Sequence, residues 1–252
     1  MITFQHLYKQ YNQHVILHDV SGAFQRGKIN LVIGTSGTGK SVLMKCLVGI
    51  TKPTSGEVLF DGRDIINSSP KTIIGIKREI GMLFQGSALL DSKTVEQNVK
   101  FPLDMLTNMP NSEKLDRVNL CLARVGLQNV SHKLPNEISG GMQKRVGIAR
   151  AIVNDAKYLF CDEPNSGLDP QTSLLIDELI QEITYEYNIT TVVVTHNLDT
   201  IFTIGDYIMF LSKGKKEWEG DSQSLLHNDV KPLQEFLMAS KMMQSIMQRG
   251  AL

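Results

Sequence analysis

The sequence Ile29-Asn30-Leu31-Val32-Ile33-Gly34-Thr35-Ser36-Gly37-Thr38-Gly39-Lys40-Ser41 joins a short apolar run to a glycine-rich loop. The apolar run has the length and composition of a buried strand, and residues 41–49 are typical of a helix. The loop itself fits the phosphate-loop pattern G-x-x-x-x-G-K-[ST] in full. Strand, loop and helix together predict an α/β core that binds a nucleotide.

Each residue type in this loop suits a triphosphate. Glycines let the backbone curl so that N–H groups point at phosphate oxygens, and the N-terminus of the following helix adds positive potential. Lys40 would place its charge on the β and γ phosphates, and Ser41 would offer a hydroxyl to Mg²⁺. The loop residues predicted to bind nucleotide are therefore Gly34, Ser36, Gly37, Thr38, Gly39, Lys40 and Ser41.

An acidic pair follows a second apolar run, residues 158–161. Parallel strands bring such ends to the ligand crevice at one edge of a sheet. Asp162 suits Mg²⁺, directly or through water, because hard cations prefer carboxylate oxygens. Glu163 suits the activation of a water for attack on the γ-phosphate, which makes it the predicted catalytic base.

Two more polar residues end apolar runs. His196 follows residues 192–195, and Gln85 follows residues 82–84. A histidine at a strand end could contact the γ-phosphate, and the Gln85 amide could contact Mg²⁺ or water. We therefore add His196 and Gln85 to the catalytic candidates, and the predicted magnesium ligands are Ser41, Gln85 and Asp162.

The rest of the chain alternates strand and helix patterns. Residues 1–33 are typical of strands broken by turns, and from about 91 to 155 the pattern is helical, with Ser112 and Ser139 as candidate N-caps. Such alternation predicts a parallel sheet with helices on both faces. Further strands are expected at 57–60, 80–84, 157–161, 190–194 and 207–211, and a further helix at about 171–187.

Composition limits the function classes. Of the 252 residues, 26 are Lys or Arg and 26 are Asp or Glu, so the formal net charge is +0 and no basic field favours nucleic acid as a partner. The longest run without Asp, Glu, Lys or Arg is the twelve residues 187–198, too short to span a bilayer. No signal-peptide pattern opens the chain. Cys46, Cys121 and Cys161 match no zinc or redox spacing, so buried thiols in a reducing cytosol are expected.

The stretch Ile138-Ser139-Gly140-Gly141-Met142 narrows the class of nucleotide-binding protein, because it begins a predicted helix shortly before the acidic pair. With this element, the chain resembles the ATP-binding subunits of ABC transporters over residues 2–220. The resemblance implies the ABC ATPase fold: a P-loop NTPase core with a parallel sheet, an N-terminal antiparallel β subdomain and a helical subdomain at about 91–155. It also implies Mg²⁺-dependent ATP hydrolysis and one ATPase domain over residues 1–220, followed by a helical extension over residues 221–252.

Roles follow the motifs of that family. Tyr11 lies where the family stacks an aromatic ring on adenine, and Gly34 to Ser41 is its Walker A motif. Asp162 and Glu163 match the Walker B aspartate and catalytic glutamate. The remaining matches are Gln85 with the Q-loop, residues 166–169 with the D-loop, His196 with the switch histidine, and Ser139, Gly140 and Gly141 with the signature motif, which in that family contacts ATP held by a second copy.

Departures from the family pattern are few. Ile138 and Met142 stand where the signature usually has Leu and Gln, while Ser139 and both glycines are intact. Gly167 replaces the commoner Ala of the D-loop. Nucleotide capture by the signature is therefore expected to survive these changes.

Residues 84–103 carry a finer resemblance, to the ATPases of Mce/Mla lipid transporters. The segment after Gln85, with Ala88, Leu89 and Leu90 and later Phe101 and Leu103, is similar to theirs. Because a catalytic-site glutamine leads directly into these apolar residues, Gln85 to Leu103 is expected to form the groove that receives a permease. The resemblance implies transport of phospholipid or another lipid, an integral-membrane permease, an Mce-type substrate-binding protein, and a place on the cytosolic face of the inner membrane through the permease. The segment could also be packing shared with an importer of a polar solute.

Other classes that use a phosphate loop fit less well. DNA-maintenance ATPases split the nucleotide-binding head with long coiled coils, and no heptad run lies between Gly37 and Asp162. A small-molecule kinase needs no signature motif. Translation-type ABC proteins carry two heads in one chain, and this chain has one.

The sequence of the expected C-terminal extension allows two interpretations. Leu233, Phe236, Leu237 and Ser240 share one helical face, and Met238, Met242, Met243 and Met247 fall close together. Methionine-rich surface adapts to partners. The extension therefore either contacts the neighbouring subunit, which the Mce/Mla resemblance favours, or packs on its own domain.

Overall fold

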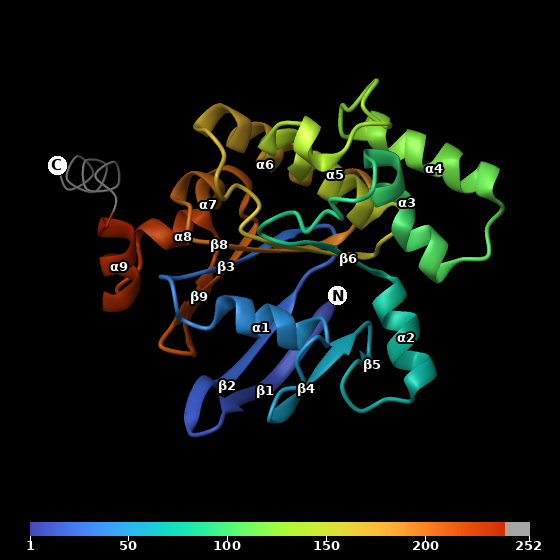
Figure 1. The fold of residues 1–252 in the computed structure, drawn as a ribbon. Helices are drawn as coiled ribbons and strands as arrows, with labels where there is room; N and C mark the ends of the chain where they lie inside the picture. The colour runs from blue at the N-terminus through green and yellow to red at the C-terminus, as the bar shows by residue number, and fades with distance from the viewer. Residues whose placement is uncertain (240–252) are drawn as a thin grey trace.

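The computed structural model describes residues 1–239, which form two β-sheets with helices around them (Figure 1). The larger sheet has six strands in the order β10-β9-β3-β8-β7-β6. The five strands from β9 to β6 are parallel to one another, and β10 pairs antiparallel with β9. In chain order the strands are β3 (Ile29–Ile33), β6 (Ile80–Leu83), β7 (Tyr158–Asp162), β8 (Thr190–Thr195), β9 (Tyr207–Ser212) and β10 (Lys215–Gly220).

The smaller sheet is antiparallel and has the order β2-β1-β4-β5. Its strands are β1 (Ile2–Tyr11), β2 (His14–Phe24), β4 (Ser55–Phe60) and β5 (Arg63–Asp64). Figure 1 shows this sheet below the parallel sheet, with helix α1 between them. The predicted parallel sheet and antiparallel β subdomain are both confirmed.

Helices cover both faces of the parallel sheet, with α3, α4 and α5 grouped at one side (Figure 1). That group is the predicted helical subdomain. In chain order the helices are α1 (Lys40–Leu47), α2 (Pro70–Arg78), α3 (Val95–Leu106), α4 (Asn111–Arg124), α5 (Gly140–Ile152), α6 (Pro170–Glu186), α7 (Leu198–Ile204), α8 (Ser222–Leu226) and α9 (Lys231–Met238), with a 3₁₀ turn at Pro135–Glu137.

Alternating side chains of the parallel strands belong to two hydrophobic cores, one on each face of the sheet. In β7, Leu159 and Cys161 join the core under the helical layer, whereas Tyr158 and Phe160 join the core shared with α1 and the antiparallel sheet. The period-two pattern of a pleated strand explains this division. Cys46, Cys121 and Cys161 are all buried, as expected.

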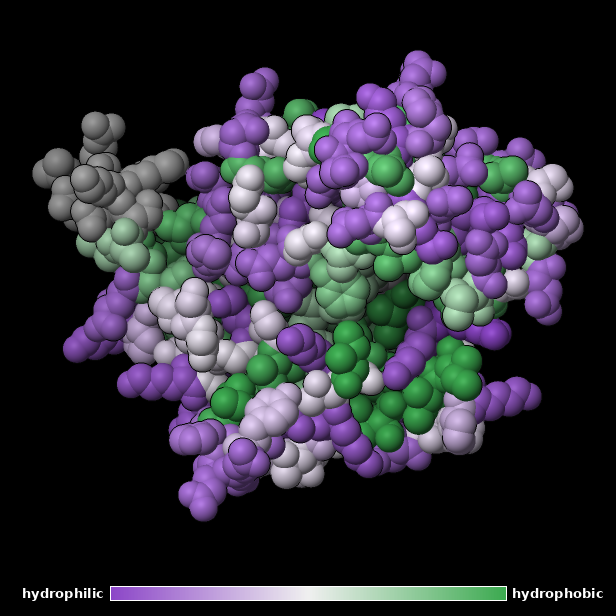
Figure 2. Space-filling view, in the orientation of Figure 1, coloured by the Kyte–Doolittle hydropathy of each residue, from purple (hydrophilic) through white to green (hydrophobic). Residues whose placement is uncertain are grey.

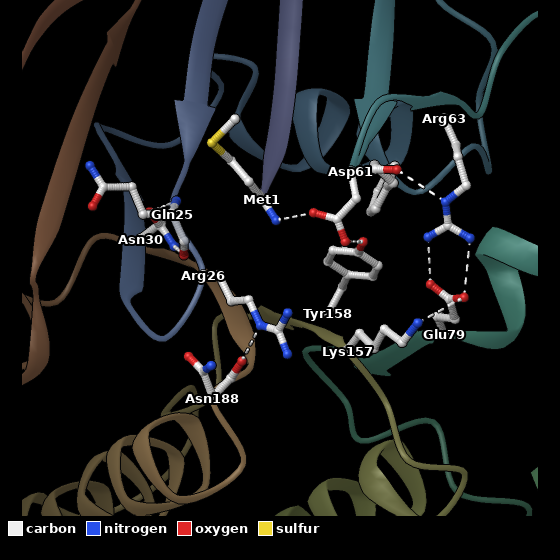
Figure 3. A network of polar contacts seen from close by, with 11 residues as sticks. Met1, Gln25, Arg26, Asn30, Asp61, Arg63, Glu79, Lys157, Tyr158 and Asn188 are labelled. Atoms are coloured by element: carbon white, nitrogen blue, oxygen red, sulfur yellow. Dashed lines mark hydrogen bonds and ion pairs between the residues drawn. The ribbon is translucent and has the colours of Figure 1, made fainter.

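A polar network joins the two sheets where β7 begins (Figure 3). The Tyr158 hydroxyl donates to Asp61 Oδ2 over 2.5 Å. Beside it, Glu79 accepts from Arg63 over 2.6 Å, and the Lys157 ammonium lies 3.3 Å from the same carboxylate. These contacts fix the antiparallel sheet against the core at the end of β7 opposite Asp162.

Several local expectations were incomplete. Helix α4 starts after Pro110, which has no side chain to cap it, so the predicted cap at Ser112 is wrong. The extended Pro110 backbone already turns the chain into the helix, and Ser112 falls within the first turn. Helix α2 was not predicted, although Ser69 caps it and Pro70 stands at its first position.

The described part of the C-terminal extension packs on its own domain. Leu233 and Leu237 are fully buried in the main core, and the Phe236 ring lies 5.7 Å from the ring of Phe210 in β9. Ser240, Met242, Met243 and Met247 lie outside the described residues. Within residues 1–239, no helix combines the length and apolar character needed to span a membrane.

Candidate functional site

Three neighbouring strands of the parallel sheet end at the candidate site. β3 leads into the phosphate loop, β8 ends at Thr195, and β7 ends at Asp162. Their register pairs Ile33 with Thr195 and Asp162 with Val194. Because all three strands run parallel, the residues after them meet at one edge of the sheet, where α/β proteins bind ligands.

The phosphate loop closes on itself through Lys40. The Lys40 ammonium donates to the carbonyl oxygens of Gly34 and Thr35, each over 2.8 Å, and the Thr38 hydroxyl donates to the Thr35 carbonyl over 2.9 Å. Gly34 has φ 146, and a Cβ there would lie 2.2 Å from the Leu211 carbonyl oxygen. Only glycine therefore fits the point where the loop leaves the strand.

Lys40 is a buried cation facing two carboxylates. It is 7% exposed, and burial lowers the pKa of its ammonium, while the charges of Glu163 and Asp162 act in the opposite direction. A cation with little water around it attracts an anion more strongly than an exposed one does. Lys40 is therefore suited to a highly charged phosphate group.

Ser41 and Asp162 supply neighbouring oxygens at the base of the site. The Ser41 hydroxyl donates to Asp162 Oδ1 over 3.3 Å. Burial and the nearby Glu163 charge raise the pKa of Asp162, while the Ser41 hydrogen bond opposes them. A hydroxyl and a carboxylate that share a partly buried position form a donor set that fits Mg²⁺.

Glu163 and His196 face each other above this base. His196 Nδ1 lies 2.7 Å from Glu163 Oε1, and the Glu163 side chain is 14% exposed. Glu163 has φ 48, and its backbone N–H donates to the Val194 carbonyl over 2.9 Å. A non-glycine residue in the left-handed region is uncommon and concentrates at functional sites. The loop therefore places the Glu163 carboxylate beside the histidine.

Gln85 lies beyond this cluster. Its amide donates to the Ser166 hydroxyl over 3.4 Å, and among residues 1–239 it makes no hydrogen bond to Ser41 or Asp162. The structure thus links Gln85 to the loop after Glu163, and its assignment as a magnesium ligand stays a prediction. No group of three or more His, Cys, Asp or Glu side chains able to hold a metal occurs in the described part of the chain.

Two cations of α5 bind the segment after Gln85, and neither was predicted as a functional residue from the sequence. The buried Lys144 ammonium donates to the Gln85 carbonyl oxygen. Arg150 donates to the carbonyl oxygens of Ser87 over 2.5 Å and Ala88 over 2.7 Å. Burial lowers the pKa of both side chains. The available signal was the presence of cations on a helix that also carries many apolar residues, since buried charges need partners.

Ser87 and Ala88 both have left-handed backbones, with φ 60 and 47. Arg150 binds the carbonyl groups of these two residues. The cation therefore stabilises an uncommon conformation at the start of the segment that resembles the Mce/Mla ATPases.

The signature residues form the exposed start of α5. Ser139 is its N-cap and accepts from the Met142 N–H over 3.3 Å, while Gly141 approaches Thr172 so closely that a Cβ would lie 2.6 Å from its methyl group. Ile138 is buried and Met142 is half-buried against the main core. The two departures from the family pattern thus point inward and leave Ser139 and Gly140 exposed.

Tyr11 lies at the end of β1 and is 45% exposed. The Lys9 ammonium sits 4.5 Å from the centre of its ring. The adjoining strand β2 touches the phosphate loop, since a Cβ on Gly39 would lie 3.1 Å from the Ile16 carbonyl oxygen. The adenine contact of the Tyr11 ring stays a prediction.

An apolar groove lies between α2 and α3, over the end of β6 (Figures 1 and 2). Phe84, Leu90 and Phe101 line it and are each 38–39% exposed. Leu103 is buried and Leu89 packs against the core, so these two predicted groove residues do not line it. Its other lining residues include Met82, Ala88, Pro102, Leu106 and Arg150.

Comparisons with known proteins agree with this geometry. Residues 17–166 match the family model described as ABC transporter. The "Probable ribonucleotide transport ATP-binding protein mkl" of Mycobacterium bovis is 39% identical over 231 residues, which cover 92% of this chain and 64% of that protein. The "Methionine import ATP-binding protein MetN" of Carboxydothermus hydrogenoformans is 41% identical over 215 residues, covering 85% of this chain and 64% of that protein. The chain therefore spans less than two thirds of the length of these relatives.

Two solved structures share the fold. The post-hydrolysis dimer of the ATP-binding cassette MJ0796, bound to ADP and Pi, is 30% identical with a TM-score of 0.80, covering 88% of this chain and 98% of that one. The cbiO1 protein of Clostridium perfringens, part of the ABC transporter complex cbiONQ, is 30% identical with a TM-score of 0.82 and covers 90% of each chain. The predicted fold class is confirmed.

Proposed function

The chain belongs to the ABC transporter family, and we propose that it is the ATP-hydrolysing subunit of a membrane transport complex. The observation that carries this proposal is the meeting of Lys40, Asp162 and Glu163 at adjoining strand ends, beside Ser41 and His196. A phosphate-binding cation, a metal-binding carboxylate and a second carboxylate beside a histidine are groups that suit the hydrolysis of ATP.

Each group has a distinct task in this proposal. Lys40 binds the β and γ phosphates, and Glu163 accepts a proton from the attacking water. His196, 2.7 Å from Glu163, orients that carboxylate and the γ-phosphate. Mg²⁺, held by Ser41 and Asp162, would neutralise charge on the phosphate oxygens.

A second copy of the chain completes the site. Ser139 and Gly140 are exposed at the start of α5, where a hydroxyl and free N–H groups can meet a phosphate. We assign them to the ATP of the partner copy, which the dimeric state of the MJ0796 cassette supports.

The apolar groove is the proposed site for an integral-membrane permease. Leu90 and Phe101 leave much apolar surface uncovered, and the segment that includes Leu90 starts at Gln85, next to the loop of Glu163. Contact at the groove would thus be linked to the nucleotide. On this proposal the chain lies on the cytosolic face of the inner membrane, attached through the permease.

The proposed substrate is a phospholipid or another lipid, delivered with an Mce-type substrate-binding protein. Support comes from the resemblance of residues 84–103 to the Mce/Mla ATPases. The second candidate is import of a polar solute, which the names of the methionine-import and ribonucleotide-transport relatives favour.

One experiment separates these proposals. The complex is purified through a tag on this chain from native membranes, its subunits and extractable ligands are identified by mass spectrometry, and its ATPase rate is measured with phospholipid vesicles. Copurified lipid and a changed rate support lipid transport. A binding protein for an amino acid, nucleotide or sugar, without lipid, supports the second candidate, and absence of ATP hydrolysis contradicts both.

A further inference from the structure

A buried polar triad lies behind the candidate site. Asn165 Nδ2 donates to Asp177 Oδ1 over 2.8 Å and to the Thr200 hydroxyl over 2.9 Å. The Thr200 hydroxyl in turn donates to Asp177 Oδ2 over 2.8 Å. All three side chains are buried, so each hydrogen bond forms away from water and is costly to break.

The triad joins the two loops that carry the reacting pair. Asn165 is two residues after Glu163, Thr200 is four residues after His196, and Asp177 lies on α6 beneath both. The loops already touch at the surface through Glu163 and His196. The triad adds a second connection from below, so a shift of either loop would break a buried hydrogen bond.

The charge of Asp177 selects one orientation of Asn165. The carboxylate is an acceptor only, so it requires the amide nitrogen to face it. Asn165 Oδ1 points elsewhere and has no hydrogen-bond partner within residues 1–239. Protonation would turn one carboxyl oxygen into a donor, so the Thr200 hydroxyl could no longer donate to that oxygen. The hydrogen-bond arrangement that constrains both segments therefore depends on the ionised carboxyl.

This carboxylate lies in a place that disfavours its charge. Burial raises the pKa of Asp177 to about 6, against hydrogen bonds from Asn165 and Thr200 that lower it. Asp199 of α7 lines the same small pocket and raises the pKa further, and the pocket's other lining residues are uncharged. The Cys161 thiol of β7 also lies within the electrostatic influence of Asp177. Burial raises the pKa of this thiol, so the thiol stays neutral.

We propose that Asp177 is a positioning residue for hydrolysis, which fixes the loop after Glu163 against the helix after His196 through Asn165 and Thr200. This inference rests on the proposed ATPase function. It assigns Asp177 no contact with ATP, because the partners of its carboxylate are side chains of the loop after Glu163 and of helix α7. Its loss should therefore lower kcat and leave nucleotide binding to the phosphate loop unchanged.

The test compares the complex carrying Asp177→Asn with the wild-type complex from pH 5 to pH 8. At pH 8 we expect kcat to be about 10- to 100-fold lower in the variant, as for a misplaced reacting group. KM for ATP should change less than about two-fold. At pH 5 the wild-type carboxyl is mostly protonated, so the ratio of the two kcat values should approach one.

Variants of the other members keep the test open if Asp177→Asn folds poorly. Thr200→Val should lower kcat at pH 8, and Thr200→Ser, which keeps the hydroxyl, should restore it. Thr184→Val is the matched control, because it removes a different buried hydroxyl, on α6. The Thr184 hydroxyl is bound to Ile180 and Thr191, away from Glu163 and His196. The control variant should leave kcat unchanged.

Each outcome is decisive. A kcat ratio that is constant over pH, or equal kcat in wild type and Asp177→Asn at pH 8, overturns the inference. Equal losses in Thr184→Val and Thr200→Val also overturn it, since the effect would then be structural. If the wild-type complex does not hydrolyse ATP, the proposed function itself is wrong, which is a different result.

Discussion

The free energy of unfolding of the Asp177→Asn variant, relative to that of wild type, should rise as pH rises. The pKa of this carboxyl is about 6 in the folded chain, against an ordinary value of 3.8. The folded state therefore holds the proton more tightly than the unfolded state. Stability contributed by the protonated carboxyl is complete below pH 3.8 and is lost as pH rises through about 6.

The magnitude follows from the two pKa values. They differ by about 2.2, and one pKa unit corresponds to about 1.36 kcal/mol, so ionisation of Asp177 costs about 3 kcal/mol in full. Integration between pH 5 and pH 8 gives about 1.4 kcal/mol of this loss. Asparagine does not titrate, so the variant should gain about that much free energy of unfolding, relative to wild type, over this interval.

Urea unfolding of both proteins at matched pH values measures the difference between their free energies of unfolding. The titration of every other group contributes equally to both proteins and cancels in this difference. Asp116→Asn, the same change at an exposed position of α4, is the control and should show a difference within about 0.5 kcal/mol at every pH. A difference for Asp177→Asn that stays constant with pH, or that moves against the variant as pH rises, would refute the reasoning.

Three further changes address the proposed function. Glu163→Gln should bind ATP yet hydrolyse it about 10²–10⁴-fold more slowly, because an amide cannot accept the proton, and should accumulate as a dimer in light scattering with Mg-ATP; wild-type turnover would remove Glu163 from the chemistry. Lys40→Ala should abolish hydrolysis and weaken nucleotide binding, measured by calorimetry, and unchanged binding would contradict the role of its charge. Phe101→Glu in the groove should release the permease during copurification while ATP binding persists, with exposed Leu120→Glu on α4 as control; retention of the permease would exclude the groove.

The phosphate loop and the strand ends could be predicted because their chemistry is local. Gly34 to Ser41 matches a local sequence pattern whose glycines permit the curled loop, and β7 and β8 can be predicted as apolar runs that stop at Asp162 and Thr195. Once the sheet is parallel, these ends must meet. The meeting of Glu163 with His196 thus follows from pattern and topology.

The buried triad, and the hydrogen bonds from Lys144 and Arg150 to the segment after Gln85, could not be predicted in the same way. Asp177 lies on an amphipathic helix, where a lone carboxylate usually faces water, and its partners stand 12 and 23 positions away. Arg150 reaches the Ser87 carbonyl from 63 positions away. Such contacts depend on tertiary packing, and no periodicity encodes them.

The groove shows the same limit on a smaller scale. Ala88, Leu89 and Leu90 are consecutive apolar residues, and the sequence alone assigned all three to the permease-binding surface. The left-handed backbone at Ser87 and Ala88 turns the chain so that Leu89 packs on the core while Ala88 and Leu90 line the groove. A charge at Leu89 would thus disturb folding, whereas a charge at Phe101 tests docking.

The polar contacts around the site suggest how nucleotide and permease affect one another. Arg150 and Lys144 join α5, whose first residues meet the partner's ATP on our proposal, to the segment that lines the groove. Asp177 joins the loop of Glu163 to that of His196. Gln85, bonded to Ser166, lies between these two sets of contacts. Movement of α5 would therefore reach the groove directly through the two cations. It would reach the segment after Glu163 through the hydrogen bond of Gln85 to Ser166 and through the packing of Gly141 on Thr172. The weakest of these links, the 3.4 Å contact between Gln85 and Ser166, is consequently the one that can open without breaking a buried charge contact.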